Sequence, residues 1–317
     1  MARRRLPDWP SRVGAAAAAG GRMSSLTKHN RVAYLYIAPW LVGFFCLTLV
    51  PFASTFVFSF TDYSVLRPPK FVGLANYVKM FTEDDLFPKS LWVTTKYVFI
   101  SVPLKLAFAL LVAIILNKNI KGIGLYRTIY YMPSIFGGSV ALSILWRMLF
   151  QGDGFINRLL AAVGIMGPDW LGDQRFSLIT ISLLQVWQFG SSMVLFLAAL
   201  KQVPEYLYEA ARIDGASKLR IFRSITLPLI TPIVFFNLVM QTVNAFQSFT
   251  TAFVITSGGP LHSTYLYAIL LYDNAFKYFK MGYASALSWV LFMILMVVTG
   301  FLFKSSSSWM HYMDTEN

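Results

Sequence analysis

Six long apolar segments constrain this sequence more than any other feature. A helix needs about 20 apolar residues to cross the hydrocarbon core of a bilayer. The segments that approach or exceed this length cover residues 33–60, 91–116, 128–150, 176–200, 225–250 and 281–303. Hydrophobic residues make up 56% of the 317-residue chain and charged residues only 13%, which excludes most water-soluble folds. The sequence therefore predicts an all-α membrane protein with six transmembrane helices.

The distribution of basic residues predicts how these spans are oriented. If the N-terminus is cytoplasmic, the cytoplasmic segments hold 16 Lys and Arg residues and the outer loops hold 8. Cytoplasmic loops carry the excess of positive charge in membrane proteins. We therefore expect residues 1–30 to form a cytoplasmic tail, residues 31–303 one transmembrane domain, and residues 304–317 a second cytoplasmic tail. The net charge of +13 comes from these basic islands and does not indicate a nucleic-acid-binding protein.

Few residues of this chain suit metal or nucleotide chemistry. Cys46 is the single cysteine, which excludes an internal disulfide and a thiolate metal cluster, and the three histidines lie far apart in the sequence. The phosphate-binding pattern G-x-x-x-x-G-K-[ST] does not occur. We expect no metal site, no bound cofactor and no catalytic residue, so any ATP chemistry belongs to another chain.

The predicted cytoplasmic loop 201–224 differs from an ordinary connection. Pro204 suits the first turn of a short helix, and Leu207, Ala210 and Ala211 recur at helical spacing before Gly215, which suits a helix end. Such a helix could lie on the lipid surface as an amphipathic segment. Its small residues could equally allow another protein to approach closely, and physical chemistry alone leaves both readings open.

This loop resembles the EAA loop of binding-protein-dependent ABC importer permeases. The motif Glu-Ala-Ala is followed by Asp-Gly-Ala and then by Leu-Pro, at the family's spacing and between two spans. In that family the loop is a coupling helix that docks into a groove on a cytoplasmic ATPase. The resemblance implies the same role for Glu209, Ala210, Ala211, Asp214, Gly215, Ala216, Leu227 and Pro228.

Other motifs resemble the maltose-type (MalF-like) carbohydrate branch of this family. They are Gly73–Tyr77, Tyr131–Pro133, Thr256–Pro260 and Gly282–Ala286, whereas residues 1–30 match nothing we recognise. The outer loop 151–175 is short compared with the periplasmic domain of the maltose permease. The resemblance implies the type I ABC importer permease fold in a bacterial cytoplasmic (inner) membrane. It also implies a second permease, two ATPase subunits holding ATP and Mg, and an extracytoplasmic solute-binding protein.

Polar residues form stripes on two predicted spans. Asn237, Gln241, Asn244 and Ser248 follow one another at intervals of four, three and four residues. These side chains could bind sugar hydroxyls or join neighbouring helices. The resemblance maps sugar contacts onto the fifth span, where Ala245 replaces a polar residue, so maltose is not the expected substrate. The residues predicted to line a substrate path are Tyr130, Ser134, Gln185, Trp187, Gln188, Gln241, Asn244, Ala245, Ser248 and Lys105.

Lys105 falls near the middle of the second predicted span. An unpaired cation at that depth costs several kcal/mol, and the predicted spans contain no Asp or Glu. Lys105 therefore pairs with a carboxylate of the second permease or balances an anionic substrate, such as a uronate oligosaccharide of the alginate type.

The function predicted from these features is that of the permease subunit in an ATP-driven carbohydrate importer, with an oligosaccharide as substrate and alternating access as mechanism. The alternative is an ion-coupled secondary sugar transporter. Such a carrier normally shows intramembrane carboxylates and an internal repeat, and neither is visible in this sequence.

Overall fold

The computed structural model describes residue 34 and residues 36–118, 121–306 and 308–309. The predicted N-terminal tail lies outside the described residues, as does most of the predicted C-terminal tail. The chain divides into two compact units, residues 1–57 and residues 58–317.

The first unit contributes most of one long apolar helix, Tyr36–Ser59. Within it, a π-helical turn, η1 (Phe45–Leu49), leads directly into α2 (Val50–Ser59). Pro51 has no backbone N–H, so the carbonyl one turn earlier lacks its usual donor, and a wider turn is a common adjustment at such a point.

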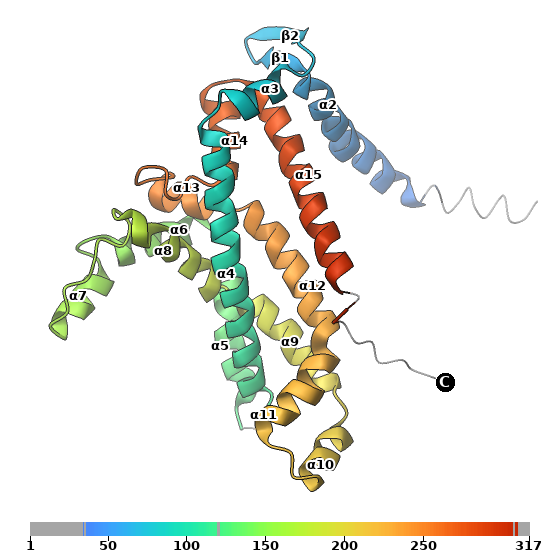
Figure 1. The fold of residues 1–317 in the computed structure, drawn as a ribbon, viewed down its shortest axis with the longest axis vertical. Helices are drawn as coiled ribbons and strands as arrows, with labels where there is room; N and C mark the ends of the chain where they lie inside the picture. Colours follow the sequence, from blue (N-terminus) through green and yellow to red (C-terminus); the bar gives the residue numbers. More distant parts are fainter. Residues whose placement is uncertain (1–33, 35, 119–120, 307, 310–317) are drawn as a thin grey trace, which may run out of the picture. The chain divides into compact units, whose positions relative to one another are not determined.

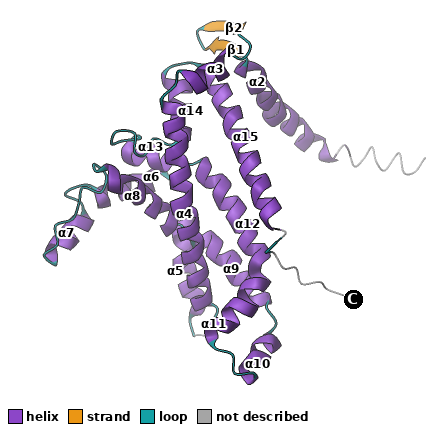
Figure 2. Cartoon of the chain, viewed as in Figure 1, coloured by secondary structure: helices purple, strands orange, loops and turns teal. Residues whose placement is uncertain are grey.

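In the second unit, the described residues are helical apart from one hairpin and the connecting loops (Figure 2). The strands β1 (Thr61–Ser64) and β2 (Arg67–Phe71) pair antiparallel. The helices are α3 (Ala75–Thr82), α4 (Leu86–Leu116), α5 (Ile123–Ile135), α6 (Val140–Phe150), α7 (Phe155–Ala162), α8 (Gln174–Trp187), α9 (Gly190–Gln202), α10 (Glu205–Ile213), α11 (Lys218–Ile221), η2 (Phe222–Thr226), α12 (Leu227–Phe246), α13 (Thr250–Thr256), α14 (Tyr267–Tyr272), η3 (Asp273–Lys277) and α15 (Met281–Ser306).

Four described helices are long and apolar enough to cross a membrane, and two bent helix pairs raise the number to six. The four are Tyr36–Ser59, Leu86–Leu116, Lys218–Phe246 and Met281–Ser306. The prediction of six apolar spans agrees with this count when each bent pair is one span. The fifth span begins at Lys218 rather than at residue 225, because α11 and η2 continue directly into α12.

Two predicted spans are not the continuous helices that hydropathy suggests. The chain bends by 97° between Ile123–Ile135 and Val140–Ala162, and by 46° between Gln174–Trp187 and Gly190–Gln202. Gly138, at the first break, has a φ of +71°, a left-handed conformation that ends a helix and suits glycine. A hydropathy window reads through such a break because glycine scarcely interrupts an apolar run.

The long helix α4 is the central element of the second unit, where it packs against α8, α9, α12 and α14. It extends from the end that carries the hairpin and α3 to the opposite end, where α10 and α11 lie (Figure 1). Its face toward these helices includes the fully buried Tyr97, Ala109 and Ala113. The core therefore lies along α4, and the hairpin and the 201–224 loop occupy opposite ends of the unit.

Glycine permits a close helix approach in this core. A Cβ atom on Gly190, at the start of α9, would lie 2.8 Å from the backbone of Tyr130 and Tyr131 in α5. Small residues at such crossings let backbones pack directly in membrane proteins. The contact holds α5 against the break between α8 and α9.

Candidate functional site

A cavity of about 470 Å³ lies where three helix breaks meet. Gly137 and Gly138 line it from the break between α5 and α6, Gln188 from the break between α8 and α9, and Gln247 and Phe249 from the break between α12 and α13. Irregular backbone at membrane depth is tolerated where it is buried in protein or lines a cavity. Discontinuous helices of this kind form the binding sites of many membrane transporters.

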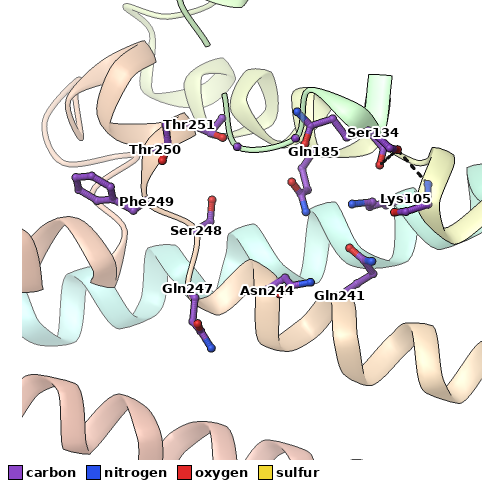
Figure 3. Close-up of a pocket in the computed structure, with 14 residues that line it drawn as sticks. Lys105, Ser134, Gln185, Gln241, Asn244, Gln247, Ser248, Phe249, Thr250 and Thr251 are labelled. Atoms are coloured by element: carbon purple, nitrogen blue, oxygen red, sulfur yellow. Dashed lines mark hydrogen bonds between the residues drawn. The ribbon is translucent and has the colours of Figure 1, made fainter. Parts of the chain in front are cut away.

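Seven of the ten residues predicted to line a path surround this cavity, from α4, α5, α8, α12 and the breaks (Figure 3). They are Lys105, Ser134, Gln185, Gln188, Gln241, Asn244 and Ser248. Polar groups that lie up to about 140 residues apart in the sequence thus share one space. Their part in transport stays a prediction.

The other three predicted residues do not line the cavity. Ala245 is fully buried in the helical core, because neighbouring residues of a helix point about 100° apart and Asn244 takes the position toward the cavity. Tyr130 lies with its ring 6.2 Å from that of Phe189, and Trp187 lies 6.1 Å from Trp146. These aromatic rings belong to the packing around the breaks rather than to the cavity wall.

Hydrogen bonds fix one wall of the cavity and leave another wall free. The Ser134 hydroxyl donates to the Gln188 carbonyl at 3.1 Å and accepts from the Ser191 N–H at 3.0 Å, so it joins α5 to the break between α8 and α9. In the described part of the chain, the side-chain amides of Gln185, Gln241 and Asn244 form no hydrogen bond. These amides are therefore available to a ligand or to water.

The sequence interpretation missed several residues of the cavity wall, and all of them lie at or beside the helix breaks. A search for glycine pairs and hydroxyl residues within apolar segments would have found some of them. They are Gly137, Gly138, Ser191, Phe249, Thr250 and Thr251.

Lys105 reaches into the cavity from α4, between Gln185 on one side and Gln241 and Asn244 on the other (Figure 3). Its side chain is only 5% exposed. Among the described residues, none forms a hydrogen bond or an ion pair with its ammonium group, and the cavity wall contains no Asp or Glu. Lys105 therefore gives the cavity a positive charge that the described chain does not compensate.

The 201–224 loop has the helix and turn that its sequence predicts. The helix α10 is followed by Gly215, with a φ of +74°. The Ala216 N–H donates to the Ala211 carbonyl at 2.9 Å across this turn, which is the bond of a Schellman helix end. Because the conformation is left-handed, a β-branched side chain at Gly215 would be strained even though nothing surrounds it.

The helix α10 exposes an apolar surface beside its charged residues. Tyr206 is 66% exposed and Ile213 is 86% exposed. Of the motif residues, Glu209, Ala210, Asp214 and Gly215 are exposed, and Ala211, Ala216, Leu227 and Pro228 are half-buried. Exposed apolar side chains at the end of a membrane protein are typical of a surface that another protein or the lipid covers.

One hydrogen bond joins α10 to the fifth span. The hydroxyl groups of Tyr208 in α10 and Thr226 in η2 lie 3.2 Å apart. Thr226 directly precedes α12, whose residues Gln241 and Asn244 line the cavity. The 201–224 loop is thus connected to the cavity wall through a single helix.

Comparison with known proteins identifies the family of this chain. Residues 96–310 match the family described as "binding-protein-dependent transport system inner membrane component". The probable ABC transporter permease protein YesP of Bacillus subtilis (strain 168) is 49% identical over 96% of this chain and 99% of its own length. The trehalose/maltose transport system permease protein MalF of Thermococcus litoralis is 33% identical over 86% of this chain and 92% of its own length.

The fold is similar to that of one chain in a solved structure. That structure is a bacterial ABC transporter involved in the import of the acidic polysaccharide alginate, and the TM-score is 0.79 at 19% sequence identity. The match covers 90% of the present chain and 99% of the other. Together with the family match and the permease relatives, this similarity identifies the fold as that of an ABC importer permease. From its sequence family and its fold, the present chain belongs to the inner membrane components of binding-protein-dependent transport systems, as a multi-pass transport subunit rather than an enzyme.

Proposed function

We propose that this permease subunit forms half of a carbohydrate path and couples that path to ATP hydrolysis on a separate cytoplasmic ATPase. The observation that carries the proposal is the convergence of three helix breaks on one polar cavity. Its trehalose/maltose relative supports carbohydrate as the substrate class. The free amides of Gln185, Gln241 and Asn244 suit sugar hydroxyls, since an amide both donates and accepts hydrogen bonds.

The second part of the proposal is that α10 is the coupling helix. Its exposed Tyr206 and Ile213 would enter a groove of the ATPase, and Glu209 would fix the orientation. Closure of an ATPase dimer would then move α10, and the Tyr208–Thr226 contact would transmit the movement to α12. The cavity would open alternately to the two sides of the membrane, as a population shift between two states.

The assembly that this mechanism needs contains more chains. We propose a second permease that completes the cavity, two ATPase subunits that hold ATP and Mg, and an extracytoplasmic binding protein that delivers the sugar. The membrane would be a bacterial cytoplasmic membrane, with the α10 end facing the ATPase. The 16-to-8 distribution of basic residues supports that orientation.

An ion-coupled carrier is the competing function. Its coupling ions normally bind to carboxylates within the membrane. The described helices α4, α12 and α15 contain no Asp or Glu. These spans therefore offer no carboxylate relay, and ATP is the better-supported source of energy.

The experiment is uptake by proteoliposomes that contain the purified complex. The permease is tagged, its co-purifying subunits are identified, and uptake of labelled oligosaccharides is measured with ATP and the binding protein. We expect uptake to need ATP and to persist when ionophores remove ion gradients. Sugar uptake that follows an ion gradient without ATP would contradict the proposal.

A further inference from the structure

We propose that the cavity selects carbohydrates that carry a carboxylate, and that Lys105 is the residue that binds this group. The inference rests on the proposed function and specifies its substrate class. It comes from the position of one buried cation among uncharged polar groups.

The Lys105 ammonium group has no bonding partner among the described residues. The side chain is 5% exposed and reaches into a polar cavity, without a hydrogen bond or ion pair to any described residue. A buried charge is stabilised by a counter-charge, by hydrogen bonds or by water. Because the cavity wall contains no carboxylate, a negatively charged ligand would remove an existing electrostatic cost.

The remaining cavity wall offers hydrogen-bond donors and no negative charge. The side chains of Gln185, Gln188, Gln241 and Asn244 can donate through their amide N–H groups, and none carries a negative charge. Ser191, in the first turn of α9, also lines the cavity, and a helix N-terminus carries partial positive charge. The cavity thus combines a cation with donors, which is the environment that a carboxylate on a hydroxyl-rich sugar requires.

A second lysine of α4, Lys96, differs from Lys105 in its exposure and in its partners. Lys96 is exposed, and its ammonium group lies 5.0 Å from the centre of the Trp92 ring. Lys96 therefore has an aromatic partner and access to the surface, whereas Lys105 has neither within the described chain. This contrast makes Lys96 the matched control for Lys105.

The competing explanation is a structural ion pair between Lys105 and a carboxylate of the second permease. Such a pair would neutralise the charge before any sugar entered, and Lys105 would then affect assembly rather than selectivity. The two explanations differ in what happens to a neutral sugar, which the experiment below measures directly.

The experiment uses the complete complex and pairs of sugars that differ in one group. Each pair is a uronate disaccharide or trisaccharide, from oligogalacturonate or alginate, and its carboxyl-reduced form, in which a CH₂OH group replaces each carboxylate. ATP-driven uptake is measured in proteoliposomes. Equilibrium dialysis against the complex without binding protein separates the selectivity of the cavity from that of the binding protein.

We expect at least one acidic sugar to bind and to be taken up at least about tenfold better than its reduced form. Lys105→Met should remove this preference by lowering uptake of the acid about tenfold, while the reduced sugar changes less than about twofold. Lys105→Arg should keep the preference, because it keeps the charge. Lys96→Met should behave as the unmodified complex does.

Three outcomes would overturn the inference. Equal losses for acidic and reduced sugars in Lys105→Met, or failure of that variant to assemble while Lys105→Arg assembles, would indicate the structural pair. ATP-driven uptake of neutral sugars alone would end the inference and leave the proposed function intact. Absence of any ATP-driven sugar uptake would instead remove the proposed function.

Discussion

The cavity and the coupling loop are built in opposite ways. The cavity wall takes residues from Lys105 to Thr251 and gathers them in the second unit from several helices and three breaks. The coupling loop is one continuous segment, 201–224, whose α10 has no buried residue and whose direction depends on Gly215. A selective binding site needs side chains held in place on several structural elements. A site that transmits motion needs a rigid, exposed element with a defined turn.

This difference separates the expected effects of substitutions. Changes at the cavity should alter which sugar moves and how tightly it binds. Changes at the loop should alter how much sugar moves for each ATP hydrolysed, without changing the preferred sugar. The following substitutions test that separation, from the largest expected effect to the smallest.

Gly215→Val should have the largest effect. Valine is strongly disfavoured at a φ of +74°, so the end of α10 would reorganise and uptake should fall about tenfold or more while ATP hydrolysis continues. Uptake and hydrolysis are measured in the same proteoliposomes. Gly215→Asn is the control, because asparagine tolerates this conformation. Normal coupling of uptake to ATP hydrolysis in the valine variant would show that Gly215 is not needed for coupling.

Asn244→Leu should reduce uptake about tenfold, since the lost amide leaves polar groups of the sugar unpaired. The assembled complex should still hydrolyse ATP. Asn237→Leu is the matched control on the same stripe: its amide donates to the Ile233 carbonyl at 3.0 Å and does not line the cavity. If Asn244→Leu lowers only the recovery of assembled complex, the stripe serves helix packing instead.

Glu209→Lys should weaken association with the ATPase by about fivefold, since reversing one exposed charge changes an interface by roughly 1 kcal/mol. Association is measured by the amount of ATPase that co-purifies at increasing salt. Glu205→Lys places the same change on the same helix, outside the Glu-Ala-Ala motif. Equal effects of both variants would indicate general electrostatics rather than a specific contact.

Tyr208→Phe should have the smallest effect. It removes the 3.2 Å contact with Thr226, and a neutral hydrogen bond contributes about 0.5–1.5 kcal/mol. We expect the amount of sugar moved per ATP to fall about twofold. Thr226→Val should give a similar loss, and the double variant should lose little more, because both changes break one interaction. Fully additive losses would show that the two hydroxyls act separately.

The same contrast explains which parts of the molecule the sequence predicts. The coupling loop can be found by reading along the chain because its helix, its glycine turn and its charges are local. The apolar spans can also be found, because hydropathy is a property of each segment. A hydropathy profile does not reveal the breaks at Gly137–Gly138 and Gln188–Phe189, because no charged residue or proline marks where they interrupt the apolar runs.

Long-range contacts are the part that the sequence leaves open. The polar stripe of α12 identifies Gln241 and Asn244, but only the fold brings Lys105 and Gln185 beside them. Nothing in the local sequence pairs Tyr208 with Thr226, because that contact depends on how α10 turns back toward η2. Ala245 shows the opposite case: the resemblance predicts a path residue, whereas the helix turns it into the core.

The separation of selection from coupling is tested most directly by one paired measurement on Asn244→Leu and Gly215→Val. ATP hydrolysis, with and without loaded binding protein, and uptake of several sugars are recorded for each variant in proteoliposomes. We expect Asn244→Leu to keep the stimulation of hydrolysis by the binding protein and to change the order of preferred sugars. We expect Gly215→Val to lose the stimulation and to keep the order. Two variants with the same loss of stimulation and the same sugar preference would contradict the account.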